Sequence, residues 1–185
     1  MADNKIKYGI SNVHYALDNG DGTYGTPKAF PGAVSISFAA QGDRNVFYAD
    51  NIEYWVNNTN NGYEGDLEVA MLTDAVRQDI LGETLNATDK TLAEIQSSAD
   101  AIRFALGFDV EGDDKTIKFW FVNCTASRPG ENASTKEDTI TPQTDTITIN
   151  AAPRASDGVV RFKTTDATIS SVIEDWYDAV YVPAQ

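Results

Sequence analysis

The chain has 185 residues and a formal net charge of −14, with 42% hydrophobic and 10% aromatic residues. This length predicts one domain with a substantial core. The 14 Lys and Arg residues are scattered along the chain, which argues against binding to a nucleic-acid backbone. Cys124 is the only cysteine, which excludes an internal disulfide. The N-terminal residues lack the apolar segment of a signal peptide, and no apolar run approaches the ~20 residues of a membrane span. We therefore expect a cytosolic protein without membrane contact.

Alternation of apolar and polar residues is the dominant pattern in the sequence. It predicts strands with one buried face in four segments, 34–38, 104–110, 146–150 and 160–163. A fifth segment, 117–122, is apolar at nearly every position and is predicted to be a strand covered on both faces. The short polar segment before it predicts a hairpin turn. We expect the carboxylates around this turn to be solvated: Asp109, Glu111, Asp113 and Asp114.

Helical patterns are short and few. Asp74 is placed to cap a helix that ends at Gly82. Four apolar residues recur at helical spacing near the C-terminus and predict an amphipathic helix: Ile169, Val172, Ile173 and Trp176. Together the patterns predict a mainly β single domain over 1–185, a β-sandwich or barrel. One short α-helix flanks it, a long loop projects from it, and a helix and arm over 165–185 complete it.

Two stretches do not fit a compact sandwich. Residues 41–61 combine several asparagines with aromatic residues. The segment is too aromatic for a disordered linker, and it is longer than an ordinary loop. Residues 127–142 form a polar loop that includes Lys136, Glu137 and Asp138. Because exposed aromatic patches usually mark interaction sites, the first stretch predicts an assembly or binding surface.

The sequence offers no catalytic constellation. Residues 20–25 spell G-x-G-x-x-G, but Pro27 and Pro31 follow and prevent the helix that a dinucleotide site needs. The acids at 18–22 lack the acidic residue that closes a calcium loop. His14 is the only histidine, and we expect Cys124 to be a buried small hydrophobe. We therefore expect no enzyme activity, no cofactor and no metal.

A series of short segments resembles the major tail proteins of siphophages that infect Gram-positive bacteria, the phi13-type group. The segments occur in the expected order between residue 9 and about residue 150. They are GISNVHYA at 9–16, FPGAV at 30–34, FYADN at 47–51, NNGYEGDLE at 60–68, DILGE at 79–83, FDVEG at 108–112, NCTA at 123–126, TKED at 135–138 and PQT at 142–144. No catalytic motif accompanies the resemblance.

The resemblance implies a virion protein with a tail-tube-type β-sandwich. Six subunits would join edge to edge into a ring, and rings would stack into the tube through which phage DNA is delivered without specific binding. The implied partners are the tape measure, distal tail and tail terminator proteins. The implied location is the virion tail, with the host cytoplasm during assembly. The net charge of −14 then suggests an acidic bore that repels DNA.

Two contact surfaces are predicted for such an assembly. The segment 41–61 is expected to project toward the next ring as a stacking loop. Its candidate contact residues are Phe47, Tyr48, Asp50, Asn51, Tyr54 and Trp55. Trp176, Tyr177 and Tyr181 form a second candidate contact, although the helical spacing equally favours packing of Trp176 on its own domain.

Two alternatives remain open on the sequence alone. A carbohydrate-binding β-sandwich of a phage or prophage particle would also use Trp and Tyr with acids and amides, and would stay monomeric. A cytosolic hydrolase would need an acid–base partner for His14 or Cys124, and none is evident in the sequence.

Overall fold

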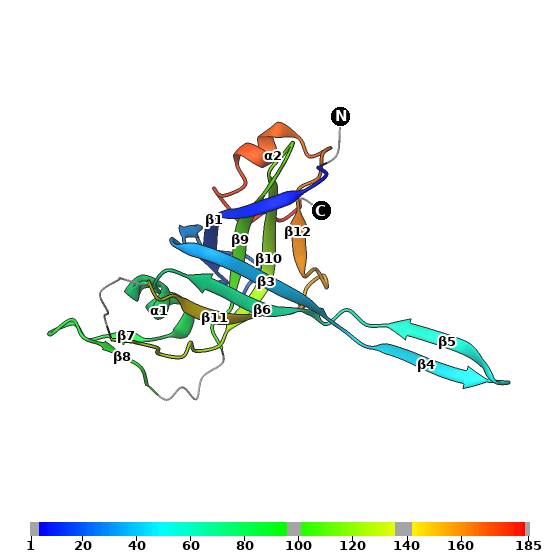
Figure 1. Ribbon diagram of the computed structural model, residues 1–185, viewed down its shortest axis with the longest axis horizontal. Helices are drawn as coiled ribbons and strands as arrows, with labels where there is room; N and C mark the ends of the chain where they lie inside the picture. The colour runs from blue at the N-terminus through cyan, green and yellow to red at the C-terminus, as the bar shows by residue number, and fades with distance from the viewer. Residues whose placement is uncertain (1–3, 96–100, 136–141, 184–185) are drawn as a thin grey trace.

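The structure is a computed structural model that describes residues 4–95, 101–135 and 142–183, and the predicted mainly β fold is confirmed. Most of its strands belong to one large antiparallel sheet (Figure 1). In chain order the elements are β1 Lys7–Leu17, β2 Lys28–Ala29, β3 Ala33–Gln41, β4 Arg44–Ala49, β5 Ile52–Asn58, β6 Gly62–Val69, α1 Asp74–Leu81, β7 Thr84–Leu85, β8 Leu92–Ala93, β9 Phe104–Gly112, β10 Ile117–Ala126, β11 Asp145–Ala151, β12 Arg161–Lys163 and α2 Ser170–Glu174.

The large sheet has eight strands in the order β2-β1-β9-β10-β11-β6-β3, with β12 also paired to β10. Strand β10 changes partner along its length. Phe119–Phe121 pair with β12, whereas Cys124–Ala126 pair with β11. The sheet therefore folds over itself, and β11-β6-β3 lies across the inner face of β1-β9-β10. The ring of Phe38 on β3 lies 4.8 Å from that of Phe121 on β10, which fixes the sandwich-type packing.

The main core fills the space between the two halves of the sheet. Most of its fully buried side chains come from β6, β9, β10 and β11 and include Leu67, Leu106, Phe121 and Ile147. Helix α1 closes one end of this core with Val76 and Ile80. The predicted end of the helix at Gly82 is confirmed by its left-handed φ of 74°. The N-cap is Thr73, whose hydroxyl accepts a bond from the Val76 amide, and Asp74 is the first helical residue.

A second core lies on the opposite face of β1-β9-β10, under the C-terminal segment. Trp120 is fully buried there, and its indole N–H donates to the backbone carbonyl of Trp176 at 2.9 Å. Strand β10 is covered on both faces, as predicted. Strand β9 was predicted to have one buried face, but residues 104–109 are all buried, because the C-terminal segment covers Ala105 as well.

The C-terminal helix is shorter than its apolar spacing predicts. Helix α2 ends at Glu174, and Trp176 lies in the following turn. Ile169 and Ile173 are 66% and 38% exposed, whereas Val172 and Trp176 pack in the second core. The apolar spacing therefore reflects the packing of Val172 and Trp176 rather than a helix whose four apolar residues share one buried face.

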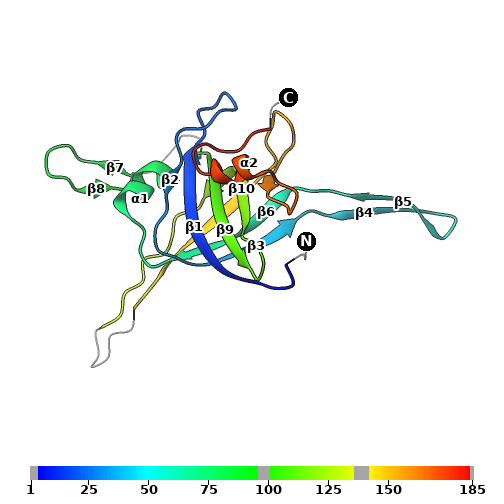
Figure 2. The same cartoon turned by 90° about the horizontal axis from the view of Figure 1, so that it is seen from above.

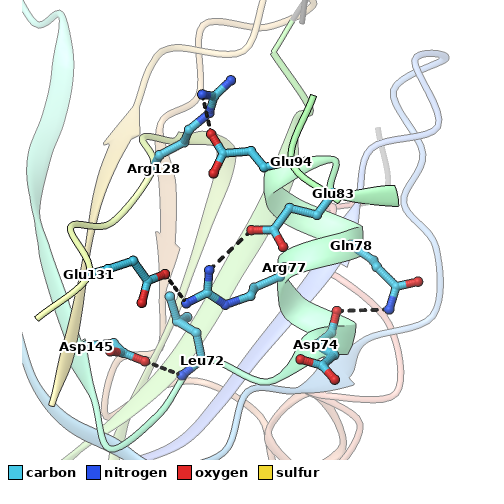
Figure 3. Close-up of polar contacts among 9 residues, drawn as sticks. All are labelled: Leu72, Asp74, Arg77, Gln78, Glu83, Glu94, Arg128, Glu131 and Asp145. Carbon is cyan, nitrogen blue, oxygen red and sulfur yellow. Dashed lines mark hydrogen bonds and ion pairs between the residues drawn. The ribbon is translucent and has the colours of Figure 1, made fainter. Parts of the chain in front are cut away.

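The end of the sandwich that carries α1 is fastened by polar contacts (Figure 3). The guanidinium of Arg77 reaches Glu83 after the helix at 3.3 Å and Glu131 at 2.8 Å. A further ion pair joins Arg128, which follows β10, to Glu94, which follows β8. The first half of the predicted polar loop 127–142 is thereby tied to α1, whereas residues 136–141 lie outside the described part of the chain.

The most extended feature is the β4–β5 hairpin, which projects far from the body on the side opposite β7 and β8 (Figures 1 and 2). We call residues 42–61 the arm. The sequence predicted a loop here, but the structure has two paired strands. Asp50 and Asn51 have φ values of 52° and 63°, as a type I′ turn requires at both central positions. Asx residues tolerate this conformation, which explains how the hairpin closes without glycine.

Candidate functional site

The outer face of the β3-β6-β11 half carries a row of carboxylates. Along β6, Leu67 and Val69 point into the core, so the alternation of a strand places Glu64, Asp66 and Glu68 on the outside. The three strands contain no Lys or Arg. We call this surface the acidic face. It was not singled out from the sequence, although the alternation in YEGDLEV contains the signal.

Hydroxyl groups on or beside the flanking strands hold two of these carboxylates, Asp66 and Glu68, in place. Glu68 accepts bonds from the hydroxyls of Thr144 at 2.7 Å and Ser35 at 2.8 Å. Asp66 accepts from Thr148 at 2.7 Å. The bond from Thr144, followed by that from Ser35, lowers the pKa of Glu68. Two of the three carboxylates of the acidic face are therefore held in fixed positions by neighbouring hydroxyl groups.

The arm grows directly out of the strands that form the acidic face. Strand β3 leads into β4, and β5 leads into β6. At the root, the Thr59 amide donates to the Asp43 carbonyl and the Asn61 amide donates to the Gln41 carbonyl, both at 2.9 Å. A Cβ at Gly42 would lie 2.1 Å from the Thr59 carbonyl oxygen, so only glycine fits there. These two backbone bonds thus fasten the root of the arm, while β4 and β5 pair as a separate two-stranded sheet.

The arm exposes large apolar side chains along its whole length. Strand β5 is exposed at every residue. Phe47, Tyr48, Tyr54 and Trp55 are 59%, 61%, 69% and 53% exposed. Phe47 pairs directly with Trp55 across the two strands, so their side chains lie on one face of the hairpin. Such a surface is unusual on a monomer and indicates a contact with another molecule.

The outer edge of β3 is also open. Strand β3 pairs with β6 on one side, and no strand in the described part of the chain pairs with its other side. Its nine residues include no charged residue and no proline. Natural proteins usually block long edge strands with such residues. The edge is therefore available for pairing with another strand.

The second predicted contact lies against its own subunit. Trp176 is 3% exposed and stacks on Tyr181, with ring centroids 5.2 Å apart. The hydroxyl of Tyr177 donates to Asp109 at 2.5 Å. Burial, followed by this bond, raises the pKa of Tyr177. Of the two interpretations that the sequence left open for Trp176, the structure shows packing on its own domain.

Asp109 was predicted to be solvated at a turn, and that prediction is wrong. The residue is 2% exposed, because the C-terminal segment covers it. Its carboxylate accepts bonds from Asn12 at 2.9 Å, Lys118 at 3.0 Å and Tyr177. Buried charges are normally paired in this way. The group acts as an anchor for the C-terminal segment.

The residues considered for catalysis are placed apart from one another. His14 stacks on Tyr177, with ring centroids 4.4 Å apart, on the outer face of the sheet. Cys124 is fully buried in the main core, and this burial raises the pKa of its thiol to about 12. The glycine-rich segment after β1 forms a turn, which is closed by an isolated antiparallel β-bridge between Asp18 and Tyr24. Within the described residues, no group of His, Cys, Asp and Glu is arranged to hold a metal ion.

Comparison of the sequence with protein-family models and with curated proteins gave no match. Neither helix of the described chain is long and apolar enough to cross a membrane. The acidic face, the arm and the open edge of β3 are the surfaces of the described chain that are placed for contact with other molecules.

Proposed function

We propose that the chain is a structural subunit of a phage-type tail tube, which assembles into hexameric rings that stack around a DNA channel. One observation carries the proposal: the acidic face, the arm and the open edge are all built on the same two strands, β3 and β6. A subunit that must present one surface to a channel and others to its neighbours needs these features in fixed relation.

Lateral assembly would use the open edge of β3. An unblocked edge strand offers unpaired backbone N–H and C=O groups to a strand of a neighbouring subunit. A contact between two different surfaces is heterologous, and its repetition forms a closed ring when six equal rotations complete one turn. Closure pairs every edge, which explains why an individual subunit can keep such an edge unprotected.

The acidic face would line the bore. A ring of six copies carries a formal charge of about −84, six times the −14 of one chain. Glu64, Asp66 and Glu68 lie on a surface that has hydroxyl and amide groups but no cation. Like charge repels the DNA backbone, so DNA would slide without adhering. In the complete tail, the tape measure protein would occupy the bore, and the distal tail and tail terminator proteins would cap the ends.

The arm would connect successive rings. It extends beyond the body of the subunit, and its aromatic side chains are placed to contact a second copy (Figure 1). Ring stacking is an open, head-to-tail arrangement, so tube growth continues until another component ends it.

Electron microscopy of the purified chain, together with sedimentation velocity, tests the proposal. We expect rings or tubes whose central channel is visible in end views. A protein that stays monomeric at high concentration would contradict the tube function. Glycan binding by such a monomer would support the carbohydrate-binding alternative instead.

The orientation of the acidic face can be tested in tubes. The double variant Glu64→Lys/Glu68→Lys places cations on the acidic face, and we expect its tubes to retain short DNA duplexes in a salt-dependent manner. The matched control Asp74→Lys/Glu174→Lys changes the net charge equally at exposed positions elsewhere. Retention by the control, but not by the face variant, would show that another surface lines the bore.

A further inference from the structure

An apolar groove opens beside the free edge of β3, between that strand and the N-terminal part of β1. It has a volume of about 430 Å3, which lies within the range of specific binding pockets. Its floor and walls are largely aromatic and aliphatic, and include Phe38, Tyr63, Phe108, Val110, Phe119 and Phe121. The groove is thus an opening through which part of the main core reaches the surface.

The groove exists because β1 and β3 do not pair. Strand β1 has register shifts against β9 on both sides of Ile10 and Ser11, and Gly9 and Asn12 have φ values of 66° and 51°. Such bulges bend a strand away from its neighbours. Tyr8 and Val34, on opposite rims of the groove, remain 54% and 50% exposed.

The charge of the groove is opposite to that of the chain as a whole. Lys7 and Arg161 line it, and none of the described lining residues is acidic. The guanidinium of Arg161 lies over the ring of Tyr63, 5.0 Å from its centroid. In a chain of net charge −14, this concentration of positive charge around an apolar groove favours an acidic, aromatic partner.

We propose that the groove is the receptor for the arm of a second copy of this chain, with the Phe47–Trp55 face inserted between β1 and β3. The arm has a complementary composition, because residues 42–61 contain three acids and one base. Its exposed aromatic pair supplies the side chains that such a groove would bury.

The arm of the same subunit does not fill the groove. It projects away from the body, and none of its described residues lines the groove (Figures 1 and 2). The backbone bonds at Gln41 and Asp43 keep its root in line with the sheet. The inference rests on the proposed stacking of rings and adds to it a defined acceptor surface. At residues 34–38 of β3, most of which line the groove, the arm would take the place of a lateral strand, and lateral pairing would use the rest of that edge.

Cross-linking between engineered cysteines tests the contact, and the complete burial of Cys124 keeps the native background low. One preparation carries Ala49→Cys, which lies on the same face of the arm as Phe47, two residues further on. The other carries Tyr8→Cys or Val34→Cys at the groove rim, together with a size tag. Leu85→Cys on β7 is the control, since Leu85 is 40% exposed at the far end of the body.

The two preparations are mixed, allowed to assemble and treated with a short bismaleimide. We expect the mixed dimer to form at least about ten times more with either rim cysteine than with Leu85→Cys. Rings or tubes in which the Leu85→Cys control cross-links as well as the rim positions would overturn the groove assignment and leave the tube proposal standing. Absence of any assembly, with no mixed dimer, would overturn both.

Discussion

The anchor of the C-terminal segment can be tested by removing one hydroxyl group. In Tyr177→Phe, the ring can still stack on His14, but the 2.5 Å bond from the hydroxyl to Asp109 is lost. Lys118 and Asn12 continue to pair with the carboxylate, so no uncompensated charge is created. The substitution therefore isolates a single charge-assisted hydrogen bond.

The size of the effect follows from the type of bond. Hydrogen bonds to charged groups contribute about 1.5–3 kcal/mol to the free energy of unfolding. Because Asp109 keeps two partners, we expect the lower part of this range, about 1.5–2 kcal/mol. For a chain of this size, each kcal/mol lowers Tm by about 2–4 °C, so the Tm should fall by about 3–8 °C.

Urea unfolding, followed by tryptophan fluorescence, measures this loss. Trp120 on β10 and Trp176 in the C-terminal segment are both buried where the segment meets the sheet, so they report its detachment. Tyr54→Phe is the matched control, because Tyr54 is 69% exposed and a change of less than about 0.5 kcal/mol is expected there. Equal stabilities of the two variants would refute the anchoring role of Tyr177.

Three further predictions concern the arm, the core and pH. Trp55→Ala should leave the stability of the subunit unchanged but weaken assembly by about 2 kcal/mol per contact, roughly thirtyfold, as measured by the critical concentration for tubes. Gly107→Ala should cost about 1–3 kcal/mol in urea unfolding, because a Cβ there would lie 2.8 Å from the Trp120 ring. The folded state raises the pKa of Tyr177 and Tyr15 above the ordinary 10.0, chiefly by burial. Their contribution to stability is therefore complete below pH 10 and should be lost as pH rises further, measured by urea unfolding across this range.

Each of these predictions has a matched control. Leu85→Ala removes an exposed apolar side chain from β7 and should leave the critical concentration unchanged. Gly130→Ala should be tolerated, because the nearest atom would lie 3.9 Å from the new Cβ. For the pH dependence, the double variant Tyr15→Phe/Tyr177→Phe should lose less stability above pH 10 than the wild type. Equal losses in both proteins would contradict the role of these two phenols.

Local patterns were sufficient to predict much of the fold. The alternation at 34–38 and 146–150 predicts strands because one face of each packs on the core. Apolar residues are therefore needed at every second position. The end of α1 at Gly82 was equally visible, because the left-handed conformation favours glycine.

What the sequence could not reveal depends on contacts between distant segments. The burial of Asp109 arises only because a segment about 70 residues further on covers β9, and no local pattern encodes that contact. The arm was missed as a hairpin because its two strands are exposed on both faces and lack alternation. The Asp50-Asn51 pair was the available signal, but it was interpreted as a contact site rather than as a type I′ turn.

The acidic face and the arm are coupled through the register of β3 and β6. Side chains alternate across a strand, so a slip of one residue would turn Glu68 and Asp66 into the core and Leu67 out of it. Backbone bonds at Gln41 and Asp43 fasten the root of the arm to these strands, and the β4–β5 pairing places Phe47 and Trp55 on one face of the arm. Burying the apolar residues of β6 therefore fixes both the outward side of the carboxylates and the place where the arm leaves the sheet. A subunit built in this way can present a charged surface and a docking surface in constant relation, which is what stacking of identical rings requires.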